Sequence, residues 1–265
     1  MAPIVALIAT GHDRLTIEPV LAAVATVRVC DRAESLRALV AAGGVRVVVS
    51  ELRDRVGASV ASVLAELAGR ASAPPVLAWA PLTDSGARDV LALAGSGAPV
   101  QVVLRGVDDL AAMARAALDG RSEPGAALPI LEAVAPAVPR PLGAFMVLCA
   151  EHGGPRLAVT RAASLLGVGS RTIESRLERA GFPPASRVIF WCAALRAAWR
   201  LDVLEQSPKQ VAAALGFASS AALANLLSRY CGCSPSALRN HGGFLAVREQ
   251  FVDYLLHSHA NRRVE

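Results

Sequence analysis

The sequence predicts an α/β domain with a doubly wound parallel sheet, followed by an all-α domain. Three observations lead to this prediction. In residues 1–120, short apolar runs without polar alternation, typical of buried parallel strands, alternate with amphipathic runs of helical period. Five prolines between residues 120 and 143 exclude a long helix there. Beyond them, the remaining sequence shows helical patterns only.

Five strand and helix pairs are expected in the first domain. The strands are expected at roughly 3–9, 26–30, 45–50, 75–80 and 99–104. The helices are expected at roughly 15–24, 33–42, 57–70, 84–95 and 108–119. This flavodoxin-like (βα)5 order gives one open sheet with helices on both faces. Such sheets bind ligands beyond the carboxyl ends of their strands, so the loops at that edge are the candidate site.

Composition and charge narrow the function. With 54% hydrophobic and 18% charged residues, the 265-residue chain is too apolar for disorder and can build a core. Residues 1–120 hold 11 Arg against 12 acidic residues, whereas residues 121–265 hold 16 basic against 10 acidic residues. The net charges are therefore −1 and +6, so we expect a polyanion to bind the second part. Of the 27 basic residues all but Lys209 are Arg, which is typical of a GC-rich bacterial genome.

The sequence indicates a cytoplasmic protein. Its five cysteines, an odd number mostly inside apolar runs, are unlike the disulfide framework of a secreted protein. The start of the chain lacks the basic region of a signal peptide, and its apolar run ends at Gly11. Residues 210–228 carry no charge over a length that could span a bilayer. Polar side chains within them and a turn at Gly216 argue against a membrane segment.

Polar loops follow the expected strands of the first domain. They read Thr10-Gly11-His12-Asp13 after the first strand, Ser50-Glu51-Leu52-Arg53 after the third, Ala80-Pro81-Leu82-Thr83 after the fourth and Arg105-Gly106 after the fifth. Over residues 1–120 this order resembles the receiver domain of response regulators. In that family an acidic pair after the first strand holds magnesium and an Asp after the third accepts phosphate. A Thr or Ser follows the fourth strand, and Lys with Pro follows the fifth.

The chemistry of that family is missing at the matching positions. Asp13 stands alone where the acidic pair is expected, and an apolar residue replaces the hydroxyl residue after the fourth strand. The phospho-acceptor position falls on Glu51, or on Ser50 if the register shifts by one residue, and Arg105 replaces the Lys. We therefore expect a degenerate receiver, a pseudo-receiver, with no aspartyl-phosphate chemistry and no bound Mg²⁺.

Glu51 and Arg105 end two strands that lie close together in this topology, so an ion pair between them is expected. The pair is either a structural salt bridge or a permanent imitation of a phosphorylated receiver. The chain has no Gly-x-Ser/Cys-x-Gly elbow with a His partner and no Walker A pattern. We expect no catalytic activity, no cofactor and no metal site.

Residues 159–181 have the pattern of a helix-turn-helix. A helix ending at Leu166, a stop at Gly167 and Ser170 as the N-cap of a second helix predict a tight turn. The second helix buries a stripe of Ile173, Leu177 and Ala180, and its opposite face carries donors for guanine edges and phosphate oxygens. The expected DNA contacts of this helix are Ser170, Arg171, Thr172, Ser175, Arg176 and Arg179.

Residues 207–230 repeat the pattern. Ser207 is expected to cap a helix that begins at Pro208 and stops at Gly216. Ser219 or Ser220 is expected to start the next helix, whose outer face is mostly Ala. The expected DNA contacts of this repeat are Lys209, Ser219, Ser220, Asn225 and Arg229.

Two further helices are predicted. The helix expected at 185–204 would be about 30 Å long, close to the ~34 Å between major-groove openings on one face of DNA. It could therefore hold both reading helices on one side of a duplex. A last helix at roughly 244–258 is expected to pack on the second repeat or to make a dimer contact.

Three segments carry a second resemblance. They are residues 170–177 (Ser-Arg-Thr-Ile-Glu-Ser-Arg-Leu), residues 214–217 (Ala-Leu-Gly-Phe) with Ser219-Ser220, and residues 229–239 (Arg-Tyr-Cys-Gly-Cys-Ser-Pro-Ser-Ala-Leu-Arg). Over roughly 141–240 the chain resembles the AraC/XylS-type DNA-binding domain. The resemblance implies two helix-turn-helix units joined by a long helix, in a bacterial transcription regulator. The expected organisation is a pseudo-receiver at 1–120, a linker at 121–140 and a DNA-binding domain at 141–259.

Double-stranded DNA is the expected partner, and the two repeats are expected to contribute unequally. The first should read bases, while the second should mainly anchor on the backbone through Lys209, Arg229 and a helix N-terminus. A regulatory role without phosphorylation is expected for the first domain. Two alternatives stay open for it, a small-ligand sensor above the strand ends and a dimerisation or partner-binding module. A homodimer and a contact with RNA polymerase also stay open.

Overall fold

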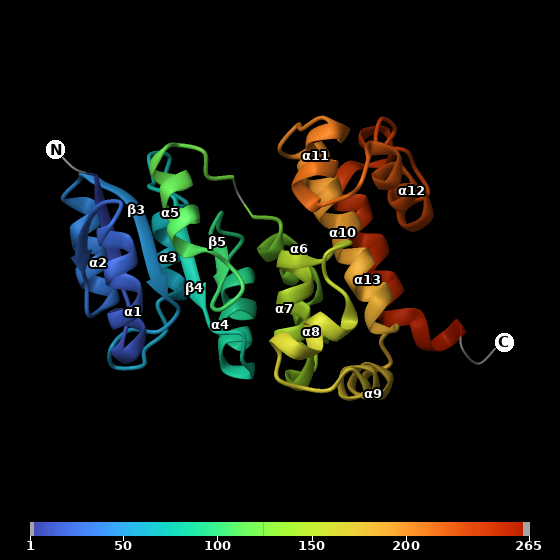
Figure 1. The fold of residues 1–265 in the computed structure, drawn as a ribbon, viewed down its shortest axis with the longest axis horizontal. Coiled ribbons are helices and arrows are strands. Elements are labelled where there is room, and N and C mark those ends of the chain that lie inside the picture. The colour runs from blue at the N-terminus through green and yellow to red at the C-terminus, as the bar shows by residue number, and fades with distance from the viewer. Residues whose placement is uncertain (1–2, 124, 262–265) are drawn as a thin grey trace. The chain divides into compact units, whose positions relative to one another are not determined.

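The computed structural model describes residues 3–123 and 125–261. The chain divides into two compact units, residues 1–128 and residues 129–265. The first unit is the α/β part and the second is helical, as Figure 1 shows by colour along the chain. Both units match the predicted fold class, an α/β domain followed by an all-α domain.

The first unit contains one parallel sheet of five strands. The strands are β1 (Ile4–Ile8), β2 (Thr26–Val29), β3 (Val45–Glu51), β4 (Val76–Ala80) and β5 (Gln101–Leu104). Their order in the sheet is β2-β1-β3-β4-β5, which is the flavodoxin-like order. In the middle of β3, Val47, Val48 and Val49 are all fully buried, because helices cover both faces of the sheet. This confirms the predicted doubly wound sheet.

Helices alternate with these strands along the chain. They are α1 (Gly11–Ala22), α2 (Ala33–Ala41), α3 (Ala61–Ala68), α4 (Asp84–Ala94) and α5 (Leu110–Leu118). Apolar residues of α1 and α5 pack together on one face of the sheet. Helix α3 contacts both α2 and α4, and all three of these helices contact the sheet (Figure 1).

Two helix starts differ from the sequence-based expectation. Helix α1 begins at Gly11 rather than near residue 15, which places Asp13 in its first turn. Helix α3 begins at Ala61 rather than near residue 57, because a polar turn occupies the preceding residues. There the carboxylate of Asp54 accepts hydrogen bonds from the backbone N–H groups of Val56 and Ala58. Such a side-chain hydrogen bond competes with a helical start.

Eight α-helices are described from residue 127 onward, and the first of them spans the boundary between the two units. They are α6 (Ala127–Val134), α7 (Gly143–His152), α8 (Val159–Leu165), α9 (Ser170–Ala180), α10 (Ala185–Asp202), α11 (Pro208–Leu215), α12 (Ser220–Cys231) and α13 (Gly243–Asn261). Helix α10 is central, since it contacts α7, α9, α11, α12 and α13. Helix α6 lies inside the stretch expected to be a linker, and the boundary between the units falls within it, after Leu128.

The last helix packs on the central one. Phe251 of α13 is fully buried and its ring lies 5.8 Å from that of Trp191 on α10. Phe244 meets Trp199 edge to face at 5.1 Å. The backbone N–H of Phe244 donates to the carboxylate of Asp202 at 2.8 Å, which fixes the start of α13 on the end of α10.

Among the described residues, no single helix combines the length and apolarity needed to cross a membrane. Helices α11 and α12 reach both only as a pair, and that pair is bent by 89° at its turn.

Candidate functional site

The second repeat forms two helices at a near right angle. The axes of α11 and α12 meet at 89°, and Gly216 ends α11 in the left-handed conformation that glycine adopts most readily. Ser207 and Gln210 form a capping box at the start of α11. The hydroxyl of Ser219 accepts from the backbone N–H of Ala222 and so caps α12. This is the geometry of a helix-turn-helix.

The first repeat has the same order of helix, turn and helix. Gly167 follows α8 with φ +64°, and α9 begins at Ser170. The N-cap of α9 is Gly169, not Ser170 as expected, and no side chain caps this helix. Ile173 and Leu177 are buried, so the opposite face of α9 is the one turned to solvent.

The outer face of α9 is basic and polar. Arg171 and Thr172 are exposed, and Arg171 has no ion-pair partner within the described ranges. Arg179 is also exposed, and its Nε donates to the carbonyl of the half-buried Ser175 at 3.2 Å. Arg176 differs, because its guanidinium donates to the carbonyl of Pro141 at 3.0 Å and is occupied in holding α9 to the start of the unit.

The outer face of α12 carries small side chains. Asn225 and Ser228 are exposed, and Arg229 is the cation of this helix, lying 5.9 Å from the ring of Tyr230. Ser220 is half-buried in the first turn, and Lys209 is exposed on α11. The structure therefore brings the expected contacts of this repeat to one helix-turn-helix, with less positive charge on its second helix than α9 has.

A different cluster lies at the carboxyl edge of the sheet in the first unit. Glu51 ends β3 and is 8% exposed. One of its carboxylate oxygens, Oε2, accepts from the backbone N–H of Thr10 at 3.0 Å and from the hydroxyl of Thr10 at 2.7 Å. Sequence reasoning did not assign Thr10 to the site. A hydroxyl residue directly after the first strand was the signal for it.

Arg105 joins the carboxylates of this cluster. Its guanidinium forms an ion pair with Asp13 and lies 3.8 Å from Oε1 of Glu51. The principal partner of Arg105 is therefore Asp13, and the expected pair with Glu51 is the longer of the two contacts. Ser50 does not join, because its buried hydroxyl donates to the carbonyl of Glu51 at 2.6 Å.

The proton affinity of Glu51 reflects this setting. Burial raises the pKa of the Glu51 carboxyl from its ordinary value of 4.5 to about 7. A hydrogen bond with the neighbouring carboxyl of Asp13 contributes to this rise in pKa, whereas the two hydrogen bonds from Thr10 oppose it by stabilising the charged form. The folded protein therefore holds a proton at this cluster up to near-neutral pH.

Metal-ligand chemistry is sparse in the described ranges. They contain no group of three or more His, Cys, Asp or Glu side chains that could hold a metal ion. At the carboxylate cluster the guanidinium of Arg105 contacts both acids. Burial raises the pKa of the thiols of Cys192 and Cys231 to about 12, so both stay protonated and are poor nucleophiles.

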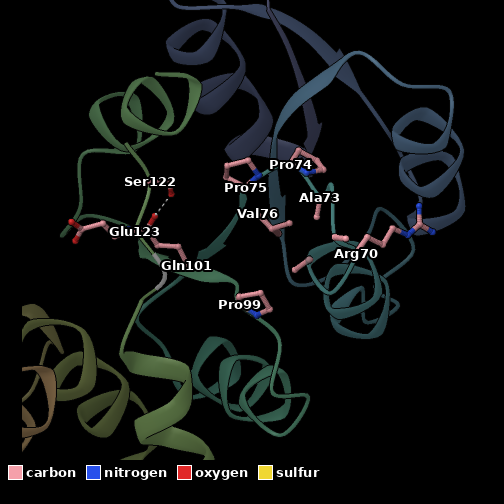
Figure 2. Close-up of a pocket in the computed structure, with 11 residues that line it drawn as sticks. Arg70, Ala73, Pro74, Pro75, Val76, Pro99, Gln101, Ser122 and Glu123 are labelled. Carbon is pink, nitrogen blue, oxygen red and sulfur yellow. Dashed lines mark hydrogen bonds between the residues drawn. The ribbon is translucent and has the colours of Figure 1, made fainter. Parts of the chain in front are cut away.

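A pocket of about 210 Å³ lies at the opposite edge of the sheet, at the amino ends of β4 and β5 (Figure 2). The crevice expected above the carboxyl ends is thus not where this pocket lies. It is lined by Ala68, Arg70, Ala71, Ala73, Pro74, Pro75, Val76, Pro99, Gln101, Ser122 and Glu123. Ser122 donates to the side-chain carbonyl of Gln101 at 3.1 Å, and prolines contribute apolar surface beside the charged residues Arg70 and Glu123.

Comparisons with known proteins do not identify a family for this chain. No family model matches the chain, and no curated protein matches it. The chain is similar to a solved structure of full-length FixJ from B. japonicum, with a TM-score of 0.37 and 18% sequence identity. The match covers 87% of this chain and 98% of the FixJ chain.

Proposed function

We propose that this chain is a sequence-specific DNA-binding transcription regulator. The observation that carries the proposal is the pair of helix-turn-helix units packed on one central helix, with Arg171 and Arg179 exposed on the outer face of α9. The net charge of +6 in residues 121–265 supports it, because phosphate attraction supplies much of the affinity for DNA. The sequence resemblance to AraC/XylS-type domains supports the same function.

We assign base readout to α9 and backbone anchoring to α12. Arg171 and Arg179 can each donate two hydrogen bonds to a guanine edge, whereas Asn225 and the alanines beside it offer few donors. Helix α10 has 18 residues and is therefore about 27 Å long, which suits two helices that enter neighbouring major-groove openings.

Selection of bound duplexes from random DNA, repeated at several salt concentrations, tests the function. Sequence readout gives an enriched site, whereas phosphate attraction alone gives none. Arg171→Ala should then relax the preference at one base position by about 1–3 kcal/mol, while Asn225→Ala should change affinity little. Equal losses of affinity in the two variants would refute the unequal roles, and the absence of any enriched site would refute the function.

For the first unit we propose a regulatory role without phosphorylation. Arg105 already supplies the positive charge beside Asp13 and Glu51, and a Glu stands at the matching acceptor position. Acetyl phosphate with Mg²⁺ should therefore leave the thermal midpoint of the full chain unchanged. A rise in the midpoint with this mixture would contradict the proposal.

A small-ligand sensor is the second candidate for this unit, and the 210 Å³ pocket favours it. Its prolines, the amide of Gln101 and the polar side chains beside them suit a small molecule that carries both polar and apolar groups. A metabolite set in the same thermal-shift assay tests this candidate. A hit should be lost in a variant that fills the pocket, such as Ala73→Phe, and kept in Glu34→Gln, which alters an exposed side chain on α2.

A further inference from the structure

The connection between α7 and α8 runs close along the central helix. Gly153 leaves no room for a side chain, because a Cβ there would lie 2.7 Å from both Cβ of Cys192 and the carbonyl oxygen of Ile189. The guanidinium of Arg196 on α10 donates to the carbonyl of Gly153 at 2.9 Å. The start of this connection is thus fixed against α10.

The same connection then reaches the turn of the second helix-turn-helix. A Cβ at Gly154 would lie 3.5 Å from the carbonyl oxygen of Leu215, the last residue of α11. Two residues later, the side chain of Arg156 covers Gly216, since a Cβ at Gly216 would lie 2.8 Å from the guanidinium carbon. The carboxyl end of a helix carries partial negative charge, so this is a favourable place for a guanidinium.

This contact joins the two helix-turn-helix units by a second route. Residues 153–156 precede α8, the first helix of the first helix-turn-helix. They touch the turn that ends α11 in the second helix-turn-helix. The other route is α10, which is continuous between the repeats. Packing on α10 already restrains each helix-turn-helix, and a second, separate connection restrains their relative motion further.

We infer that residues 153–156, which we call the clasp, fix the angle between the two helix-turn-helix units, with Arg156 as the positioning residue. This inference rests on the proposed function and adds a property to it, namely a single allowed spacing between the two halves of the DNA site. A rigid pair of binding elements gains from its second contact only when the spacing fits, and loses that gain otherwise. A loosened pair accepts several spacings.

The test compares the full-length protein with Arg156→Ala on duplexes carrying the selected site. One added base pair turns one half-site by about 35° and moves it by about 3.4 Å. The wild-type protein should lose on the order of 100-fold in affinity on this change, and Arg156→Ala less than about tenfold. Both should bind a duplex with one intact half-site equally well. Arg161→Ala, which removes an exposed Arg from α8, is the control and should behave as the wild type.

Two DNA-binding results would overturn the inference. Arg156→Ala could keep the full spacing preference, or it could weaken binding to every duplex by the same factor. The second result, together with a fall of about one in the slope of log affinity against log salt, would make Arg156 a direct phosphate contact.

A measurement without DNA separates a failure of the clasp from a failure of the proposed function. Amide hydrogen exchange should become faster in Arg156→Ala both in residues 157–166 and in residues 216–219, at unchanged thermal midpoint. The Arg161→Ala control should exchange as the wild type does in residues 216–219. Unchanged exchange in residues 216–219 of Arg156→Ala would refute the clasp whether or not the protein binds DNA.

Discussion

The buried carboxyl of Glu51 should make the stability of the first unit fall as pH rises. In the folded protein the pKa of this group is about 7, whereas in the unfolded chain it returns to its ordinary value of 4.5. Between these values the folded state binds a proton that the unfolded state does not bind. The free energy of unfolding therefore decreases with rising pH across this window, which is opposite to the usual behaviour of an ion-paired carboxylate.

The size of the effect follows from the shift. A pKa raised from 4.5 to about 7 corresponds to about 3 kcal/mol between a pH well below 4.5 and a pH well above 7. About 2 kcal/mol of this should appear between pH 5.5 and pH 8. Replacement of Glu51 by Gln keeps the side chain uncharged at every pH and removes this dependence.

Tryptophan fluorescence can report on the unfolding of the first unit, which contains Glu51. Trp79 lies on β4 and is the register partner of Glu51, while Trp191 and Trp199 lie in the second unit. A background with Trp191→Phe and Trp199→Phe leaves Trp79 as the reporter. Urea unfolding in this background, at pH 5.5 and pH 8, gives the free energy of unfolding of the first unit.

The comparison of variants decides the outcome. In the reporter background with Glu51 intact, the first unit should lose about 2 kcal/mol between pH 5.5 and pH 8, and the Glu51→Gln variant should lose much less. Glu34→Gln, at an exposed position of α2, should keep the full dependence. An equal pH dependence in the presence and absence of Glu51, or a rise in stability with pH that requires Glu51, would refute the assignment of a buried proton to this carboxyl.

Further predictions concern the second unit, and urea unfolding measures each. Phe251→Ala should lower the free energy of unfolding by about 3–5 kcal/mol, because Phe251 is fully buried. Leu256→Ala should lower it little, because Leu256 is 48% exposed. Similar losses in the two variants would mean that α13 is not part of the core. Ser219→Ala removes the N-cap of α12 and should cost about 1 kcal/mol, with no loss expected if the cap is not formed in solution. Gly153→Ala should cost about 1–3 kcal/mol or more through overpacking against α10, and a neutral result would show that the connection is not in close contact there.

Much of the fold follows from local sequence. Buried strands such as β3 were predicted from runs of Val, because a strand covered on both faces needs apolar residues at every position. Helix ends in the second unit were predicted from Ser207, Pro208 and Gly216, because capping chemistry acts between residues a few positions apart. The late start of α3 was missed, since the turn made by Asp54 competes with a pattern that is otherwise helical.

The carboxylate site was predicted in part. Glu51 and Arg105 were expected near each other because parallel strands end at a common edge, and the resemblance to receiver domains placed Asp13 with them. The choice of Asp13 as the main partner of Arg105 could not be predicted, since it depends on α1 starting at Gly11 and bringing Asp13 toward β5. The same applies to Arg176, whose donation to Pro141 joins residues 35 positions apart.

By itself, the sequence determined the type and order of the elements, the turns of both repeats and the uneven charge of the two halves. These properties arise from periodicity, capping and composition, which act within a few residues or over a whole segment. Only the tertiary structure decided which side chains meet, as when Thr10 donates to Glu51 across 41 positions or Arg156 covers Gly216. Such contacts depend on the packing of several elements at once, and no local pattern encodes that packing.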